Sequence, residues 1–65
     1  MTEFQITLTA ARVNAGYTQQ DVADKMKVSK HTIGNWENGK IHPKPAQMNM
    51  MCQLYDVPPN LVKIK

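Results

Sequence analysis

Apolar residues recur at helical spacing in the middle of the chain and predict a helix over residues 19–26. The apolar positions that share one face of this helix are Val22, Ala23 and Met26. Thr18 precedes the pattern and Asp21 follows three residues later, which is typical of a capping box that satisfies free amides at a helix start. We therefore expect the helix to begin at Gln19 and to bury its apolar face.

A second short helix is predicted over residues 30–38, after a tight turn. Ser29 is a suitable N-cap, and Ile33 and Trp36 form the apolar pair on one side of the helix. Gly39 is expected to end it in the left-handed conformation that glycine adopts readily. The two helices should therefore pack their apolar faces on a shared core.

A further helix is predicted before this pair. Thr7 can cap it and Gly16 can end it. The residues expected along its buried side are Leu8, Ala11 and Ala15. Residues 1–6, which include Phe4, show no helical period and are expected to form an extended lead-in that covers part of the core.

The last predicted helix follows a loop with two prolines. Pro43 and Pro45 favour extended conformations in the residues before them, and Pro45 suits the first turn of a helix. The stripe expected to face the core consists of Met48, Met51, Cys52 and Tyr55. One more turn over residues 60–62 should lay Leu61 on the core. Together these elements predict an all-α fold, a compact bundle of four to five short helices without a strand.

The polar side of the helix over residues 30–38 suits a nucleic-acid groove. The residues expected to face solvent are His31, Gly34, Asn35 and Asn38, with Lys30 and Thr32 at the edges. No acidic residue belongs to this set. Such a helix offers hydrogen-bond donors and acceptors to the base edges of a major groove.

A family resemblance rests on the same stretch of the chain. The residues that carry it are Thr18-Gln19, Val22-Ala23, Met26, Val28-Ser29, Ile33 and Trp36-Glu37-Asn38-Gly39. In this order they resemble the lambda-repressor-like (Cro/Xre-type) helix-turn-helix family. The resemblance implies a sequence-specific, double-stranded DNA-binding transcriptional regulator, a repressor of bacterial or phage type, with the helix over residues 30–38 in the major groove.

Two kinds of DNA contact are expected. Base contacts are assigned to Lys30, His31 and Asn35, since Lys can donate to guanine, Asn can pair with adenine and His can donate or accept. Gly34 joins them as a point of close approach to DNA, unless the glycine is neutral. The expected phosphate contacts are Gln19, Thr32, Asn38, Lys40 and Lys44. The competing interpretation is that all these residues form an ordinary solvated surface.

The resemblance has two further structural implications. It implies that Gln19 braces the recognition helix as well as touching phosphate. It also implies a partly buried ion pair between Arg12 and Glu37. Such a pair is weak evidence of net stability, but loss of one buried partner costs about 3–5 kcal/mol.

The composition permits nucleic-acid binding without requiring it. The 65 residues, with a formal net charge of +3, are expected to form one domain over residues 1–65. No apolar run is long enough to span a membrane, and no signal peptide is visible. The single cysteine cannot form an internal disulfide, so a reducing cytoplasm is the expected setting.

No group of residues supports catalysis. Two histidines in different segments, five acids and one cysteine provide no nucleophile–base pair, no metal-ligand spacing and no glycine-rich phosphate loop. A zinc site built from His31, His42 and Cys52 would need the wrong face of the last helix. The protein is therefore expected not to be an enzyme and to need neither metal nor cofactor.

The expected partner is double-stranded DNA, at a palindromic operator bound by a homodimer. One small module buries little surface, so useful affinity requires two copies on two-fold related half-sites. Met50 lies off the core stripe and could sit in a subunit contact. The alternative is a protein-interaction module, or the antitoxin of a toxin–antitoxin pair, with the same fold and a polypeptide as its chief partner. No membrane partner is expected.

Overall fold

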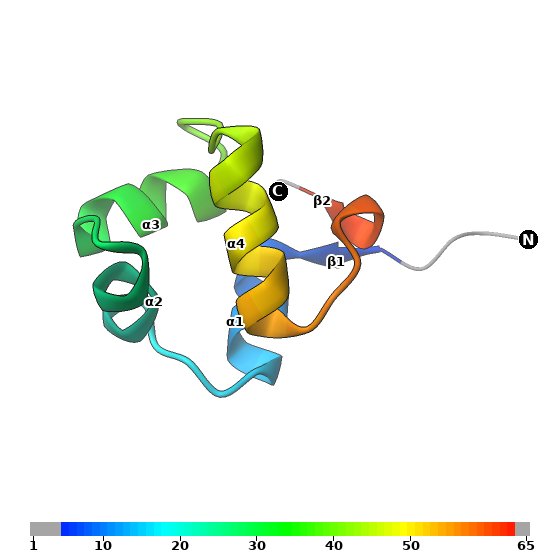
Figure 1. Cartoon of the computed structure of the whole chain (residues 1–65). Coiled ribbons are helices and arrows are strands. Elements are labelled where there is room, and N and C mark those ends of the chain that lie inside the picture. Colours follow the sequence, from blue (N-terminus) through cyan, green and yellow to red (C-terminus); the bar gives the residue numbers. More distant parts are fainter. Residues whose placement is uncertain (1–4, 64–65) are drawn as a thin grey trace, which may run out of the picture.

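Helices make up most of the described chain, and two very short strands join its ends. A computed structural model describes residues 5–63, and Figure 1 shows the course of the chain. The helices are α1 (Leu8–Asn14), α2 (Gln19–Met26), α3 (Lys30–Glu37) and α4 (Pro45–Tyr55). The remaining elements are the 3-10 turn η1 (Pro59–Leu61) and the strands β1 (Ile6–Thr7) and β2 (Val62–Lys63). The predicted helical bundle is thus confirmed.

Local caps determine where the first three helices begin. The Thr18 hydroxyl accepts from the Asp21 amide at 3.0 Å, and the Asp21 carboxylate accepts from the Thr18 amide at 2.9 Å. The predicted capping box is therefore present. Thr7 caps α1 by accepting from the Ala10 amide at 3.1 Å. Ser29 caps α3 in the same way, by accepting from the amide three residues later.

Left-handed glycines follow the ends of α1 and α3 as predicted, although Ala15 and Asn38 are cap residues outside these helices. Ala15 is exposed and serves as the C-cap of α1, so the expected burial of Ala15 is wrong. The chain turns away there because Gly16 has a φ of 87°. The helix α3 ends at Glu37, and Gly39 follows with a φ of 82° in the left-handed conformation that was predicted.

The strand pair corrects the prediction of a fold without strands. β1 and β2 run parallel, with Ile6 paired to Val62 and Thr7 paired to Lys63. Two residues are too few to show the alternation that reveals a strand in a sequence. The pairing also changes which residue packs on the core, because the half-buried Val62 does so in place of Leu61. Phe4, in the predicted lead-in, lies outside the described residues.

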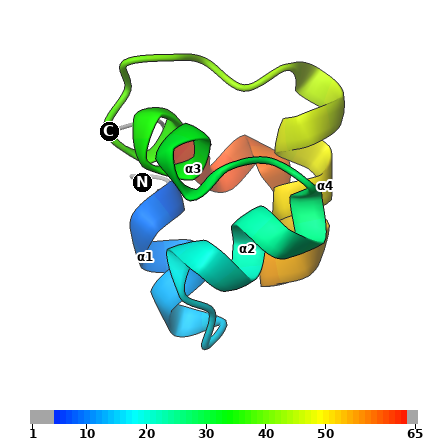
Figure 2. The same ribbon diagram turned by 90° about the vertical axis from the view of Figure 1, so that its left-hand side faces the viewer.

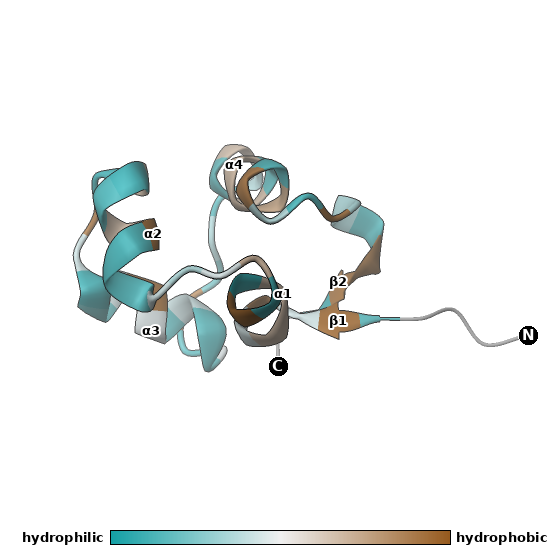
Figure 3. Ribbon diagram, turned by 90° about the horizontal axis from the view of Figure 1, so that it is seen from below, coloured by the Kyte–Doolittle hydropathy of each residue, from teal (hydrophilic) through white to brown (hydrophobic). Residues whose placement is uncertain are grey.

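One apolar core joins all four helices. Its buried residues are Leu8, Ala11, Val22, Ala23, Ile33, Trp36, Met51 and Tyr55. They include Met51 and Tyr55 of the predicted α4 stripe, Cys52 of that stripe is also buried, and Met48 packs against the cluster half-buried. In Figure 3, most residues of α2 and α3 have the hydrophilic colour, and these two helices lie at the end of the molecule away from the strands. The core thus holds α3 in place while its polar side faces outward.

Tyr55 places a phenol in this core. Tyr55 is only 5 % exposed, and its hydroxyl has no hydrogen-bond partner among the described residues. The ring lies 6.3 Å from the ring of Tyr17, measured between centroids. Burial raises the pKa of Tyr55 to about 12, with a further increase from Glu37 and an opposing effect of Arg12.

We expect Tyr55→Phe to leave the free energy of unfolding within about 1 kcal/mol of the wild type at pH 7, since no hydrogen bond to a described residue is lost. Because folding raises the pKa of Tyr55, the neutral phenol contributes its full stabilisation below the unfolded pKa of 10.0. That stabilisation is lost as the pH rises through about 12. Between these two pKa values, the free energy of unfolding of the wild type should therefore fall by about 1.4 kcal/mol per pH unit relative to that of Tyr55→Phe.

Urea unfolding followed by the fluorescence of Trp36, the sole tryptophan, measures this difference at each pH. Tyr17→Phe is the control, because it retains Tyr55 and should retain the alkaline loss. Parallel stability curves for the wild type and Tyr55→Phe above pH 10 would contradict the expected burial of a neutral phenol.

Candidate nucleic-acid interface

The helix α3 presents the polar side that its sequence predicts. Ile33 and Trp36 are 1 % and 3 % exposed and point into the core. Lys30 and His31 are exposed, whereas Asn35 is half-buried. Figure 2 views the end of the molecule formed by α2 and α3, with α4 on the other side of the bundle from α3.

A polar concavity of about 430 Å³ lies along this side of α3. Its lining residues are Gln19, Lys30, His31, Gly34, Asn35, Asn38 and Lys40. They come from the start of α2, from α3 and from the loop that follows. All four residues expected to contact bases are present, as are Gln19, Asn38 and Lys40 of those expected to contact phosphate. We refer to this surface as the α3 concavity.

Two expected phosphate contacts lie outside the α3 concavity. Thr32 is half-buried, and its hydroxyl lies 2.9 Å from that of Ser29 within the N-terminal cap. Lys44 is the exposed N-cap residue of α4, where its amide donates to the Gln47 side chain at 3.0 Å. Neither residue lines the α3 concavity.

The charge of the α3 concavity favours a polyanion. Lys30 and Lys40 line it, and no acidic residue among residues 5–63 does. The first turn of α3 also contains no acid, so the partial positive charge of its free amides is not neutralised there. The one carboxylate of α3 belongs to Glu37, and it is paired with Arg12.

Glu37 is the centre of a hydrogen-bond network that connects three helices. Its Oε2 lies 2.7 Å from Nε of Arg12, and the side chains of the two residues are only 7 % and 12 % exposed. The Arg12 guanidinium also donates to the backbone carbonyl of Tyr17 at 2.9 Å. Oε1 accepts from Gln19 Nε2 at 3.0 Å and from the Thr9 hydroxyl at 3.2 Å. The network thus joins α1 and the start of α2 to the end of α3.

Gln19 belongs both to this network and to the α3 concavity. Its amide donates to Glu37, so it links the start of α2 to the last turn of α3. A glutamine amide carries two N–H donors, which leaves one for another acceptor. The bracing contact implied by the family resemblance is therefore compatible with a phosphate contact from the same side chain.

Thr9 is the residue of this region that sequence reasoning missed. It lines a smaller polar recess of about 330 Å³ beside the α3 concavity, together with Gln19 and Glu37. Thr9 follows the first residue of α1, and its partner Glu37 lies 28 positions further along the chain. No local pattern indicates such a contact.

Gly34 has open space where a side chain would begin. A Cβ at this position would meet no atom of the described residues within 4 Å, apart from its chain neighbours and the backbone of its own helix. Packing within the protein therefore gives no reason for glycine here. The missing side chain instead leaves the middle of the α3 concavity open.

The described residues support neither a metal site nor a membrane-spanning helix. Among residues 5–63, no group of three His, Cys, Asp or Glu side chains could hold a metal ion. In the same part of the chain, every helix is too short or too polar to cross a membrane.

Comparison with known proteins gives one match. A family model described as a helix-turn-helix domain matches residues 3–63, which is nearly the whole chain. Searches of curated proteins and of solved structures found no match.

Proposed function

Because the chain belongs to the helix-turn-helix domain family and is therefore a DNA-binding protein, we propose that it is a sequence-specific regulator that reads double-stranded DNA with α3. The observation that carries this proposal is the α3 concavity, which gathers polar side chains from α2, α3 and the next loop. Two of them are cations and none is an acid. We further propose that the regulator acts as a repressor, by occupying an operator.

In this proposal α3 lies in the major groove and supplies the base contacts. Lys30 donates to guanine O6 or N7, and Asn35 pairs with adenine through its amide. His31 donates or accepts according to its tautomer. The three side chains line one surface, so they can address adjacent base pairs.

Phosphate contacts flank the base contacts. Lys40 and Lys44 lie in the loop after α3 and at the start of α4, while Gln19 and the free amides of α2 address the backbone on the other side. Thr32 and Asn38 add neutral contacts. Two copies on a palindromic operator, with half-sites about one helical turn apart, would supply the affinity that one small module lacks.

Selection of bound sites from a random duplex pool at near-physiological salt tests base reading. We expect enrichment of a palindromic motif, and we expect Asn35→Ala to relax one position of each half-site by about 1–3 kcal/mol of discrimination. Asn14→Ala is the matched control, since Asn14 is an exposed asparagine at the end of α1, outside the α3 concavity. No enriched motif from a folded protein would contradict sequence-specific binding.

Gly34→Ala should have opposite effects on the stability of the protein and on its affinity for DNA. Alanine is favoured over glycine by about 1 kcal/mol within a helix, and the space at Gly34 is open, so the variant should be more stable than the wild type. If DNA approaches the α3 backbone closely here, its affinity for the selected operator should fall at least tenfold. Thermal melting and operator titration measure the two effects. Unchanged affinity would show that Gly34 is neutral for binding.

A further inference from the structure

The segment between α3 and α4 is held in place on both sides of Ile41. The backbone amides of Lys40 and Ile41 both donate to the carbonyl of Asn35, at 3.0 and 3.3 Å. Further along the segment, Pro43 is buried. In Figure 2 the segment runs from the end of α3 over the bundle to α4. The backbone of Ile41 therefore has a fixed place within hydrogen-bond distance of Asn35, which lines the α3 concavity.

Ile41 is an apolar residue on a cationic segment. It is 51 % exposed, and the other large hydrophobic residues that are exposed in the described chain are Val13 and Met50. Lys40 precedes it and Lys44 follows at the N-cap of α4, while the segment between α3 and α4 contains no acid. Exposed apolar side chains are common on protein surfaces. Of these three, however, Ile41 alone lies between two lysines that the proposed function places on phosphates.

The flanking lysines restrict what Ile41 can meet on DNA. The Cα atoms of Lys40 and Lys44 are at most about 14 Å apart, because four residues extend no further. Both lysines can therefore reach phosphates on the same stretch of one strand. Ile41 itself is unsuited to a phosphate, since it would remove water from the anion without supplying a hydrogen bond. The group that lies between consecutive phosphates is the deoxyribose, and its C2′ methylene is apolar.

We propose that Ile41 packs against the C2′ methylene of one deoxyribose in each half-site, between the phosphates bound by Lys40 and Lys44. This contact rests on the proposed function, which places α3 in the major groove. In B-form DNA the C2′ methylene lies on the major-groove side of the backbone. RNA carries a hydroxyl at C2′. Ile41 would leave that hydroxyl without a hydrogen bond, so it selects deoxyribose over ribose whatever the base.

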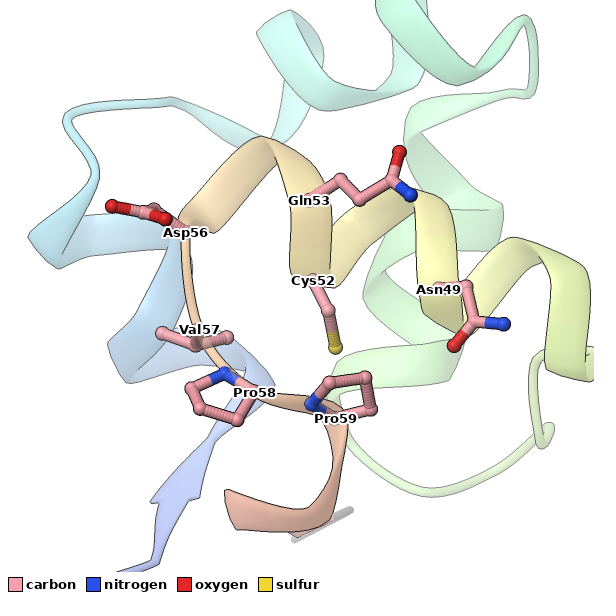
Figure 4. Close-up of a pocket in the computed structure, with 7 residues that line it drawn as sticks. All are labelled: Asn49, Cys52, Gln53, Asp56, Val57, Pro58 and Pro59. Carbon is pink, nitrogen blue, oxygen red and sulfur yellow. The ribbon is translucent and has the colours of Figure 1, made fainter.

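A hollow of about 530 Å³ at the end of α4 has a different character. Its lining residues are Asn49, Cys52, Gln53, Asp56, Val57, Pro58 and Pro59. Figure 4 shows the Asp56 carboxylate projecting away from Cys52 and Pro59. Among residues 5–63 no cation lines this hollow, and one acid does. The hollow therefore does not suit a nucleic-acid backbone, and α4 provides a reference surface away from the proposed DNA contacts.

A ribonucleotide scan of the half-site tests the contact. The full chain is titrated with duplexes that carry one half-site of the selected motif, so that a single copy binds. Each duplex has one deoxyribose replaced by ribose. We expect one position at which ribose weakens the binding of the wild type about fivefold. Ile41→Ser should bind the unmodified half-site about fivefold more weakly, and ribose at that position should change its affinity by less than about twofold.

Two variants serve as controls, and thermal melting establishes that each is folded. Ile41→Val keeps most of the apolar contact and should keep the effect of ribose. Met50→Ser removes a side chain of similar exposure, 48 %, from α4, none of whose residues lines the α3 concavity. It should bind every duplex like the wild type. Ribose also alters the shape of the sugar, but this change is the same for all variants and cancels when they are compared.

Two results would overturn the proposal while leaving the proposed function standing. The first is a wild type that binds the half-site but shows no position at which Ile41→Ser removes the effect of ribose. The second is a coupling of Ile41 to deoxyuridine in place of thymidine instead, which would assign the side chain to a thymine methyl group. A folded wild type that binds no half-site would overturn both the contact and the proposed function.

Discussion

Replacing Glu37 with alanine should lower the free energy of unfolding by about 3–5 kcal/mol. The Arg12 side chain is only 12 % exposed in the wild type, and the change removes its carboxylate partner. Among the described residues, only the carbonyl of Tyr17 would still accept from its guanidinium. It also removes the acceptor of Gln19 and Thr9. Domains below about 70 residues rarely have more than 3–5 kcal/mol of stability, so the variant should be largely unfolded at room temperature.

Thermal and urea unfolding followed by Trp36 fluorescence measure this effect. Asp24→Ala is the control, because its carboxylate is exposed and, among the described residues, accepts only from Gln20 of the same helix, at 2.9 Å. It should cost less than about 0.5 kcal/mol. The double variant Arg12→Met, Glu37→Leu should recover much of the loss, since a buried ion pair can be replaced by apolar groups. Equal melting temperatures for Glu37→Ala and Asp24→Ala would disprove a structural role for the pair.

Operator affinity should fall about 150-fold between 50 and 200 mM salt if the phosphate contacts are as proposed. Lys40 and Lys44 of two copies neutralise about four phosphates, and each neutralised phosphate contributes about −0.9 to the slope of log K against log salt. The resulting slope is about −3.6, and the salt concentration increases fourfold. Lys30 would add to this value if it also approaches the backbone.

Equilibrium titrations at several salt concentrations separate the lysines. Lys40→Gln and Lys44→Gln should each reduce the slope by about 1 per copy and weaken all sequences alike. Lys25→Gln is the control, since the Lys25 ammonium lies 5.6 Å from the centre of the Tyr17 ring and outside the α3 concavity. A slope that Lys40→Gln and Lys44→Gln leave unchanged would exclude these contacts, and a flat salt response would exclude phosphate binding altogether.

The helix starts were predictable because each cap and its partner are three residues apart. Thr7, Thr18 and Ser29 each accept from the amide three positions later, so both members of each pair can be recognised together in the sequence. The inward and outward sides of α3 follow from the same local periodicity. Ala15 shows the limit of that method, because a helix that ends one residue too soon exposes a position on the apolar side.

The candidate site was predictable in part. Periodicity identified the residues of α3. Gln19 was expected from its place at a helix start and from the resemblance, and the lysines after α3 from their place in a loop with cations. The inclusion of Gln19 and Lys40 with the α3 residues in one concavity of about 430 Å³, without Lys44 and Thr32, depends on how α2 and the loop pack against α3. The second role of Gln19 likewise depends on Glu37, which lies 18 positions away.

The sequence by itself determined the helical segments, their apolar sides and the polar, acid-free side of α3, because these depend on interactions within one or two helical turns. Only the tertiary structure decided the pairing of β1 with β2, the contact of Thr9 with Glu37 and the inclusion of Gln19 and Lys40 in the α3 concavity. These features join residues whose separation along the chain carries no periodic signal. Their formation depends on the packing of the whole core, which sets the distances between elements.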